Sequence, residues 1–316
     1  MEYDIAAEKK MNLKKEKSIR SPLFYVGDKY KLMPQLKQYF PLEIENYYDV
    51  FCGGGSASIN VEAKAYYMND SDKKIIELHD LLQRNAVDMP QFISKMHFLI
   101  EKYDLSLSEK GLNETIKFLR KEHIKTYYAR YNKNAYLKLR DDYNTNQNDT
   151  ELLYLLLIYG FNHMVRFNSD GKFNLPVGNV DWNKNVSQAL RNYSDWYINK
   201  RVFLSEGQDF SLFVNRQEFS SGDFLYFDPP YLITFSDYNK LWKEEDEHRL
   251  YDLLDELDCR GIKWGLSNML THKGKTNEIL QSWATKYKKF KIDSNYISRF
   301  DNTIKNDSEE IYVTNC

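Results

Sequence analysis

An apolar strand that ends in two prolines constrains the fold of this chain more than any other segment. Phe224-Leu225-Tyr226-Phe227 follows Gly222-Asp223 and runs into Asp228-Pro229-Pro230-Tyr231. An apolar run bounded by turn residues predicts a buried strand. The strand has to end at the prolines, because proline has no amide hydrogen to donate and fixes its own φ. We therefore expect Asp-Pro-Pro-Tyr at the carboxyl end of a strand, where open α/β sheets bind their ligands.

A second predicted strand leads into a glycine-rich loop. Tyr47–Phe51 runs into Gly53-Gly54-Gly55-Ser56. Consecutive glycines let the backbone approach a ligand closely and present amide groups at the start of a helix, which we expect to follow. A tight β–α turn without a ligand is the alternative interpretation. Ala65–Met68 predicts the next strand, and Asp70 follows it, at the position where a β-α-β unit holds ribose hydroxyls.

The remaining periodic segments complete the predicted fold. Strands are expected at Val202–Ser205, Ile262–Leu266 and Ile311–Val313, and leucines at helical spacing predict a helix over Glu247–Leu257. Alternating strands and helices, with a long helical insertion, predict an α/β fold with a doubly wound sheet and an inserted, mainly helical subdomain. We expect a flexible leader over residues 1–20, a sheet domain formed by 21–83 and 185–316, and a helical subdomain over 84–184.

Part of the helical insertion carries a local excess of positive charge. Residues 111–140 contain eight Lys or Arg against two Glu, with tyrosines between them, whereas the whole chain has a net charge of −2. A solvated helix face is the usual meaning of such a run. The local excess of one sign together with aromatic residues also fits a surface that follows nucleic-acid phosphates. The residues we select for phosphate contact are Lys117, Arg120, Lys121 and Arg130.

A hairpin is predicted near residues 161–178. Ser169-Asp170-Gly171 lies between two alternating segments, which is a turn signal. Four polar side chains in this segment can reach base edges in a nucleic-acid groove. They are Asn162, Arg166, Asn168 and Asn174.

Composition bounds the class of protein. Charged residues make up 28% of the chain, and no apolar stretch is long enough to span a bilayer, so we expect no membrane segment. The first twenty residues lack an apolar core, so no signal peptide is expected. Three widely separated cysteines without zinc spacing predict a reducing cytoplasm and no metal site. The net charge of −2 argues against a general nucleic-acid binder.

Asp-Pro-Pro-Tyr suits the activation of an exocyclic amine on a nucleobase. Such an amine is a poor nucleophile, because its lone pair is delocalised into the ring. A carboxylate from Asp228 and a carbonyl from Pro229 or Pro230 can accept its two N–H bonds and stabilise the charge that develops on nitrogen. Tyr231 offers a face for the planar base, which has to leave the duplex to reach it. Alignment with a methyl donor then supplies most of the catalysis, and no metal is required.

The order of these motifs resembles that of the Dam-type (class alpha, D12 class) DNA N6-adenine methyltransferases of bacteria and phages, over roughly residues 21–316. Phe24-Tyr25-Val26-Gly27-Asp28-Lys29 is similar to their first motif, with Asp28 where the family has Gly. The resemblance implies a Rossmann-like methyltransferase sheet that binds S-adenosyl-L-methionine. The residues implied at the cofactor are Tyr25, Lys29, Asp49, Phe51, Gly53, Gly55, Ser56, Asp70, Asp209 and Asp228, with Asp70 at the ribose and Asp209 near the adenine.

The resemblance also bears on the DNA site. Residues 161–178 are similar to the DNA-reading hairpin of the family, which adds Met164 and Pro176 to the DNA-contacting set. The best-known members methylate adenine in GATC, and Arg166 matches a base-reading arginine. Phe24 stands where several relatives have Lys, and Asn179 where several have Arg, and either difference can alter a contact to a flanking base. The expected site is therefore GATC or a related short site. The implied partners are double-stranded DNA and a restriction endonuclease encoded nearby, with the enzyme a monomer or weak dimer in a bacterial or phage-infected cell.

Three alternatives stay open on the sequence alone. The same chemistry serves methylation of cytosine N4, of RNA adenine or of a glutamine side chain. The chain could also be a DNA-binding relative that has lost catalysis. The presence of Asp228 and Tyr231, which such a protein would not need, disfavours this alternative. A dinucleotide-dependent oxidoreductase would need a hydride-transfer partner that the sequence does not offer.

Overall fold

The computed structural model describes residues 18–234, 241–293 and 308–316. Most of the predicted leader lies outside this part of the chain. The strands are β1 (Asn46–Asp49), β2 (Ala65–Met68), β3 (Arg201–Leu204), β4 (Phe224–Phe227), β5 (Lys263–His272), β6 (Lys275–Thr276), β7 (Lys288–Ile292) and β8 (Ser308–Thr314). The helices are α2 (Met33–Leu36), α3 (Lys73–Asn85), α4 (Met89–Lys102), α5 (Glu114–Glu122), α6 (Tyr127–Thr145), α7 (Thr150–Tyr159), α8 (Lys184–Tyr197), α9 (Phe210–Asn215), α10 (Glu244–Cys259) and α11 (Glu278–Trp283).

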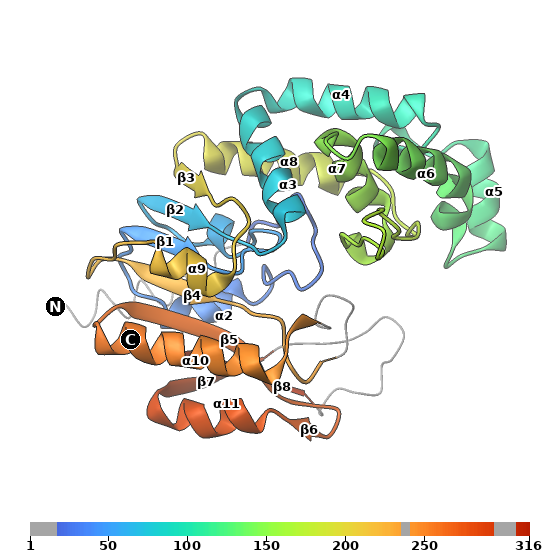
Figure 1. The fold of residues 1–316 in the computed structure, drawn as a ribbon. Helices are drawn as coiled ribbons and strands as arrows, with labels where there is room; N and C mark the ends of the chain where they lie inside the picture. Colours follow the sequence, from blue (N-terminus) through green and yellow to red (C-terminus); the bar gives the residue numbers. More distant parts are fainter. Residues whose placement is uncertain (1–17, 235–240, 294–307) are drawn as a thin grey trace.

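One mostly parallel sheet organises the molecule, in the order β3-β2-β1-β4-β5-β8-β7 (Figure 1). Neighbours from β3 to β5 pair in parallel, whereas β8 runs antiparallel to both β5 and β7. The chain order reverses between β1 and β4, so the carboxyl ends of these strands meet at a topological switch point. This confirms the predicted α/β fold and puts Asp-Pro-Pro-Tyr at that point.

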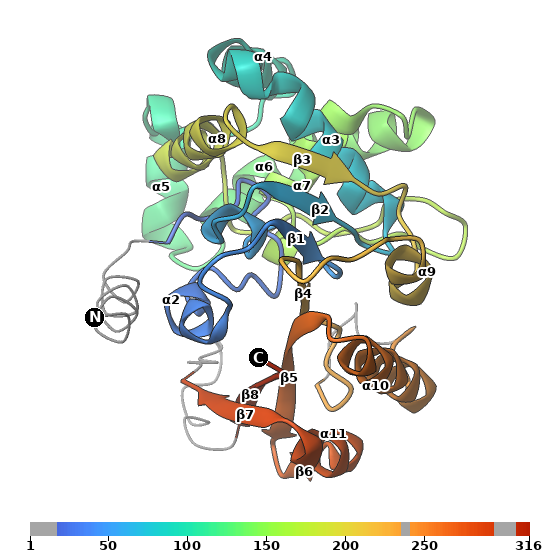
Figure 2. The same ribbon diagram turned by 90° about the vertical axis from the view of Figure 1, so that its left-hand side faces the viewer.

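The side chains of the central strands alternate between two cores. Tyr47, Phe224 and Tyr226 contribute to the core that includes α2, α3, α7 and α8. Tyr48 and Leu225 contribute to the core formed with α9, α10 and α11. Figure 2 shows α2 on one side of the sheet and α9 and α10 on the other. Burial on both faces explains why β4 is apolar at every position rather than alternating.

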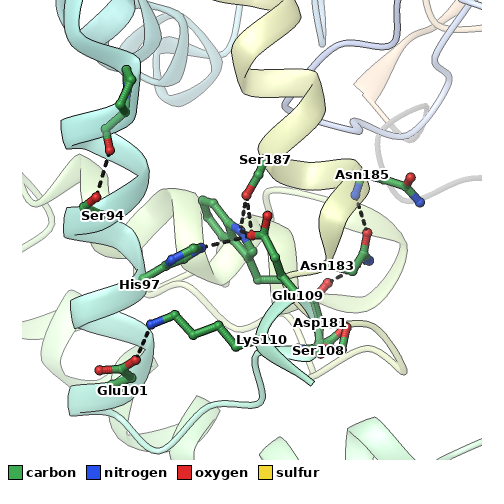
Figure 3. Close-up of polar contacts among 12 residues, drawn as sticks. Ser94, His97, Glu101, Ser108, Glu109, Lys110, Asp181, Asn183, Asn185 and Ser187 are labelled. Carbon is green, nitrogen blue, oxygen red and sulfur yellow. Dashed lines mark hydrogen bonds and ion pairs between the residues drawn. The ribbon is translucent and has the colours of Figure 1, made fainter. Parts of the chain in front are cut away.

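Helices α4 to α7 gather at one end of the molecule, away from α10 and α11 (Figure 1). Helix α7 is buried from Leu152 to Tyr159, where leucines and other apolar side chains occupy every position. A polar network ties α4 to α8 (Figure 3). In it, Glu109 accepts hydrogen bonds from Trp182 Nε1 (3.1 Å) and Ser187 Oγ, and lies 3.1 Å from His97 Nε2. Asp181 accepts two bonds from Ser108, each of 2.8 Å.

Several predicted boundaries are wrong. In the described part of the chain, no α-helix joins the glycine-rich loop to β2; one 3-10 turn, Ser58–Asn60, takes its place. The Asn60 side chain donates to Ser56 O at 2.8 Å and to Ile19 O at 2.7 Å, which closes this segment as a compact loop instead. Strand β5 does not end at Leu266, as predicted, but continues to His272, because β8 pairs with it beyond that residue. The sequence pattern also missed β7, α9 and α11.

Among the described residues, no helix is both long and apolar enough to cross a membrane.

Candidate active site

A cavity of about 520 Å³ lies where β1, β2 and β4 end. Four segments distant in sequence line it. They are residues 25–29, the loop 49–57, residues 69–72 and Asp-Pro-Pro-Tyr. Residues 165–167 of the predicted hairpin, residues 208–210 and the pair Leu241 and Trp242 complete the wall.

The cavity contains a charged cluster around Asp228. Lys29 Nζ lies 2.9 Å from Asp228 Oδ2, and the Tyr231 hydroxyl lies 3.2 Å from Asp228 Oδ1. The same hydroxyl donates to Glu310 Oε1 of β8 at 2.7 Å. Lys29 Nζ also sits 5.0 Å from the centre of the Tyr231 ring, within reach of a cation–π interaction. Asp228 and Tyr231 are therefore held by groups from the first motif and from β8.

Burial and charge act against each other at Asp228. Burial raises the pKa of Asp228, because it disfavours the charged form, and the nearby Glu310 adds to the rise. Lys29 lowers the pKa of Asp228 by its charge and its hydrogen bond. The lysine therefore favours the ionised form of Asp228, which is the form that can accept a strong hydrogen bond from an amine.

Asp70 anchors the glycine-rich loop. Its Oδ2 accepts from Gly53 N at 3.0 Å and its Oδ1 accepts from Asp72 N at 2.9 Å. Burial raises the pKa of Asp70 to about 6, against the opposing effect of these amide bonds. Asp72 caps the following helix α3, since its carboxylate accepts from Lys74 N at 2.9 Å.

Two of the loop glycines are required by close packing. A Cβ on Gly54 would approach Tyr25 Cβ to 2.9 Å, so the loop can lie against Tyr25 only without a side chain there. Gly55 has φ +73° and packs against His79, and it does not line the cavity although the sequence predicted a cofactor contact. Burial lowers the pKa of His79 to about 4, and its neutral ring donates from Nε2 to Gly53 O at 2.8 Å.

Asp28 and Asp49 hold the base of the loop. The Asp28 carboxylate accepts from Ser56 Oγ and from Tyr30 N (2.9 Å), so it joins the first motif to the loop. Asp49 is almost fully buried and accepts from Ser58 Oγ at 2.7 Å. Burial raises the pKa of Asp49 to about 7, and the carboxylates of Asp228 and Asp70 contribute to the rise. A cation placed in this cavity would favour the ionised form of all three carboxylates.

Aromatic rings form a separate wall of the cavity. Trp242 packs edge-on against Phe51, with ring centres 5.7 Å apart, and lies 5.7 Å from the Phe210 ring. Arg249 stacks on Phe210 at 4.9 Å and pairs with Asp209 at 2.8 Å. Sequence reasoning selected Phe51 and Asp209 but missed Trp242. The one sequence feature that could have pointed to Trp242 is its place just before the acidic first turn of α10.

The predicted hairpin forms, with bridges between Gly160 and Val177 and between Phe167 and Phe173. Arg166 Nε donates to Asn174 Oδ1 at 2.9 Å, and its Nη2 donates to Asn174 O at 3.0 Å. Of the residues expected to contact DNA, Arg166 is the one that lines the cavity. Asn168 Oδ1 accepts from the amides of Asp170 and Lys172, so this side chain shapes the turn.

The other predicted DNA contacts are distributed over three elements. Asn162 and Pro176 are exposed, and Met164 is partly buried against the core. Lys117, Arg120, Lys121 and Arg130 are exposed on α5 and α6, away from the cavity. Asn179 Oδ1 accepts from Tyr128 N at 2.8 Å and from Ala129 N at 3.3 Å. These two hydrogen bonds join the end of the hairpin segment to the first turn of α6.

The comparison with known proteins agrees with this architecture. The model of the family described as D12 class N6 adenine-specific DNA methyltransferase matches residues 25–295. Modification methylase StsI of Streptococcus sanguinis is 33% identical over 95% of this chain, and Type II methyltransferase M.FokI of Planomicrobium okeanokoites is 31% identical over 98%. Type II methyltransferase M1.LlaDCHI of Lactococcus lactis subsp. cremoris is 26% identical over 82%.

The relatives differ in length. The chain spans 43% of the StsI methylase and 45% of the FokI methylase, less than half of each, but 84% of M1.LlaDCHI. The matched region contains the first motif, the glycine-rich loop, the hairpin and Asp-Pro-Pro-Tyr. On this match, the chain belongs to the D12 class N6 adenine-specific DNA methyltransferases.

Proposed function

We propose that the chain transfers a methyl group from S-adenosyl-L-methionine to the N6 amine of an adenine flipped out of double-stranded DNA. The observation that carries this proposal is the meeting of Asp228, Lys29 and Tyr231 in one cavity with the glycine-rich loop. The cavity therefore combines groups that can bind the amine of a nucleobase with a loop that can bind a methyl donor.

The donor set of the cavity fits S-adenosylmethionine. Three carboxylates, Asp49, Asp70 and Asp228, face a space of about 520 Å³ and complement a cationic sulfonium. Carboxylate and backbone groups near Asp70 suit the hydroxyl groups of a ribose, and the rings beside Trp242 suit a purine. The remaining residues we assign to donor binding are Tyr25, Lys29, Phe51, Gly53, Ser56 and Asp209. The bound cofactor supplies an electrophilic methyl group.

The residues of the chain orient and activate the amine. Asp228, kept ionised by Lys29, accepts one N–H of the target amine, and a proline carbonyl of the same segment accepts the other. This arrangement stabilises positive charge as it develops on the nitrogen. Tyr231, fixed by Glu310, provides the face against which the flipped base stacks. No proton has to be removed before methyl transfer, so the site needs no strong base.

We assign target recognition to residues 84–184. Arg166, held by Asn174 at the rim of the cavity, is placed to read a base beside the flipped adenine. Exposed Lys and Arg side chains of α5 and α6 contact phosphates, which position the duplex without reading its sequence. The target is a short site such as GATC or a relative of it.

One relative is named a modification methylase and another a Type II methyltransferase. These names favour a role for the chain as the partner of a restriction endonuclease. In this role the enzyme acts as a monomer or weak dimer in the bacterial cytoplasm and protects the sites that its partner cleaves.

Long-read sequencing of genomic DNA from cells expressing the chain tests the proposal. We expect N6-methyladenine at one short sequence, and no modification in cells that express Asp228→Ala. The same data report the base, the position and the recognition site together. Methylated cytosine at the modified site, or unmodified DNA despite folded protein, would reject adenine methylation.

A further inference from the structure

A buried carboxylate outside the Asp228 cluster organises the aromatic wall of the cavity. Glu247, in the first turn of α10, is fully buried. Its Oε1 accepts from Trp242 Nε1 at 3.1 Å and from Asn268 Nδ2 at 3.4 Å. Its Oε2 accepts from the Tyr251 hydroxyl and from Asn277 Nδ2 at 3.4 Å. These four donors are uncharged and come from the segment before α10, from α10 itself, from β5 and from the N-cap of α11.

The position of Glu247 compensates for the burial of its charge. Hydrogen bonds from several donors favour a carboxylate in a low-dielectric interior. The amino end of the sixteen-residue helix α10 adds a favourable interaction with a negative charge in its first turn. A leucine at this position would leave these four donors without their acceptor. The carboxylate therefore has a role that apolar packing does not explain.

Trp242 connects this carboxylate to the cavity. The indole nitrogen is held by Glu247, while the ring lies against Phe51 and Phe210 and lines the cavity. A single N–H bond to a fixed acceptor restricts how an indole ring can turn. Glu247 thus sets the plane of Trp242 without touching the cavity itself.

The cavity offers two separate aromatic surfaces. Tyr231 lies beside Lys29 and Asp228, where the reacting amine has to be. The other surface is formed by Phe51, Phe210 and Trp242, whose rings contact one another. Methyl transfer involves two planar groups, the target base and the adenine of the donor. Since the first surface serves the base, the second is left for the donor.

We propose that Trp242 stacks on the adenine of the methyl donor and that Glu247 is a positioning residue that fixes Trp242 for this contact. The inference rests on the proposed function, because the donor is assigned to the cavity there. Glu247 then controls affinity for the donor, whereas the rate of transfer at saturating donor depends on the Asp228 cluster.

A calorimetric titration of the full chain with S-adenosylhomocysteine, without DNA, tests the proposal. We expect Glu247→Gln to weaken binding about tenfold, because an amide cannot accept from all four donors. Trp242→Ala is expected to weaken it about 10- to 100-fold, through loss of the stacking ring. For Glu247→Gln, KM for S-adenosylmethionine should rise by a similar factor while kcat changes little.

Trp283 provides the matched control. Its indole nitrogen donates to Asp255 Oδ1 at 2.8 Å, so it too links an indole to a carboxylate of α10, but it does not line the cavity. Trp283→Phe should bind the ligand as the parent does. Trp242→Phe removes the anchoring N–H and keeps a ring, so intermediate weakening is expected even if Glu247→Gln fails to fold.

Tryptophan fluorescence gives a second readout. Ligand binding should change the emission of the parent and of Trp283→Phe, and this change should be absent in Trp242→Phe. The inference is overturned if Trp242→Phe keeps the full change, or if folded Glu247→Gln binds with parental affinity or loses kcat without a change in KM. Failure of the parent chain itself to bind the ligand would instead reject the proposed function.

Discussion

Asp228 is the residue on which most of the proposed chemistry depends. In the proposed mechanism, its ion pair with Lys29 and its contact with Tyr231 place a negative charge beside the target amine. Asp228→Asn preserves the shape but removes that charge, so we expect single-turnover methyl transfer to fall about 100- to 1000-fold, by analogy with the removal of one electrostatic group from other enzyme sites. Duplex binding, measured separately, should change little. Transfer within a few-fold of the parent would reject the role of Asp228.

Lys29 is expected to set the lower pH limit of activity. Burial raises the pKa of Asp228 and Lys29 lowers it, so removal of the lysine leaves burial unopposed. The amine needs an ionised Asp228, and activity therefore declines as the pH falls through the pKa of this carboxyl group. In Lys29→Met the acid limb of the kcat profile should move to higher pH.

The neighbouring exposed Lys31 supplies the control for this experiment, since it does not line the cavity. Lys31→Met removes the same charge and should leave the acid limb in place. An unmoved limb in Lys29→Met, or equal shifts in the two variants, would contradict the assignment.

At the scale of elements, Glu109 joins three segments of the helical part (Figure 3). It accepts from Trp182 and Ser187, and His97 lies within hydrogen-bond distance. Glu109→Ala leaves buried donors without an acceptor, so we expect the free energy of unfolding to fall by about 1–3 kcal/mol. Glu101, whose pair with Lys110 is exposed on both sides, is the control, and Glu101→Ala should lower the free energy of unfolding clearly less than Glu109→Ala does. Equal costs in chemical denaturation would show that the network adds no stability.

The hairpin gives a second prediction at this scale. Arg166 is oriented by two bonds to Asn174, so its guanidinium is presented at the cavity in a fixed direction. Arg166→Ala should broaden the set of duplexes that are methylated, measured on a randomised library, with a loss of about 1–3 kcal/mol in discrimination at one base position. Lys172→Ala, at an exposed position of the same hairpin, should keep the parental preference. An unchanged preference in Arg166→Ala would place base reading elsewhere.

At the scale of the whole molecule, local chemistry explains what the sequence could predict. Strand β4 and its prolines are identifiable because their signal lies within ten residues. The interactions that complete the site are not local. Tyr231 donates a hydrogen bond to Glu310, which lies 79 positions later in the sequence. Trp242 is oriented by the Glu247 carboxylate, which lies in a helix that the sequence pattern predicts only as an ordinary amphipathic one. Strand β7 alternates exposed Lys289 and Lys291 with the less exposed Phe290 and Ile292, but this short pattern does not say which strand it joins, and pairing with β8 sets its place in the sheet.

The uneven charge of the molecule leads to a final prediction. The chain has a net charge of −2, but exposed Arg120, Lys121 and Arg130 lie on α5 and α6, at one end of the molecule (Figure 1). If these side chains bind phosphates, replacing all three by Ser should weaken binding equally for duplexes with and without the target site. The slope of log K against log salt concentration should become shallower by about 0.9 for each phosphate that the variant no longer neutralises.

Lys289, exposed on β7 at the other end of the sheet, is the control, and Lys289→Ser should leave both affinity and slope unchanged. Fluorescence anisotropy at several salt concentrations measures both quantities. A triple variant that keeps the parental slope would mean that α5 and α6 do not touch the duplex. Weakening confined to the target duplex would assign these residues to base reading, because removing a phosphate-binding side chain weakens all sequences alike.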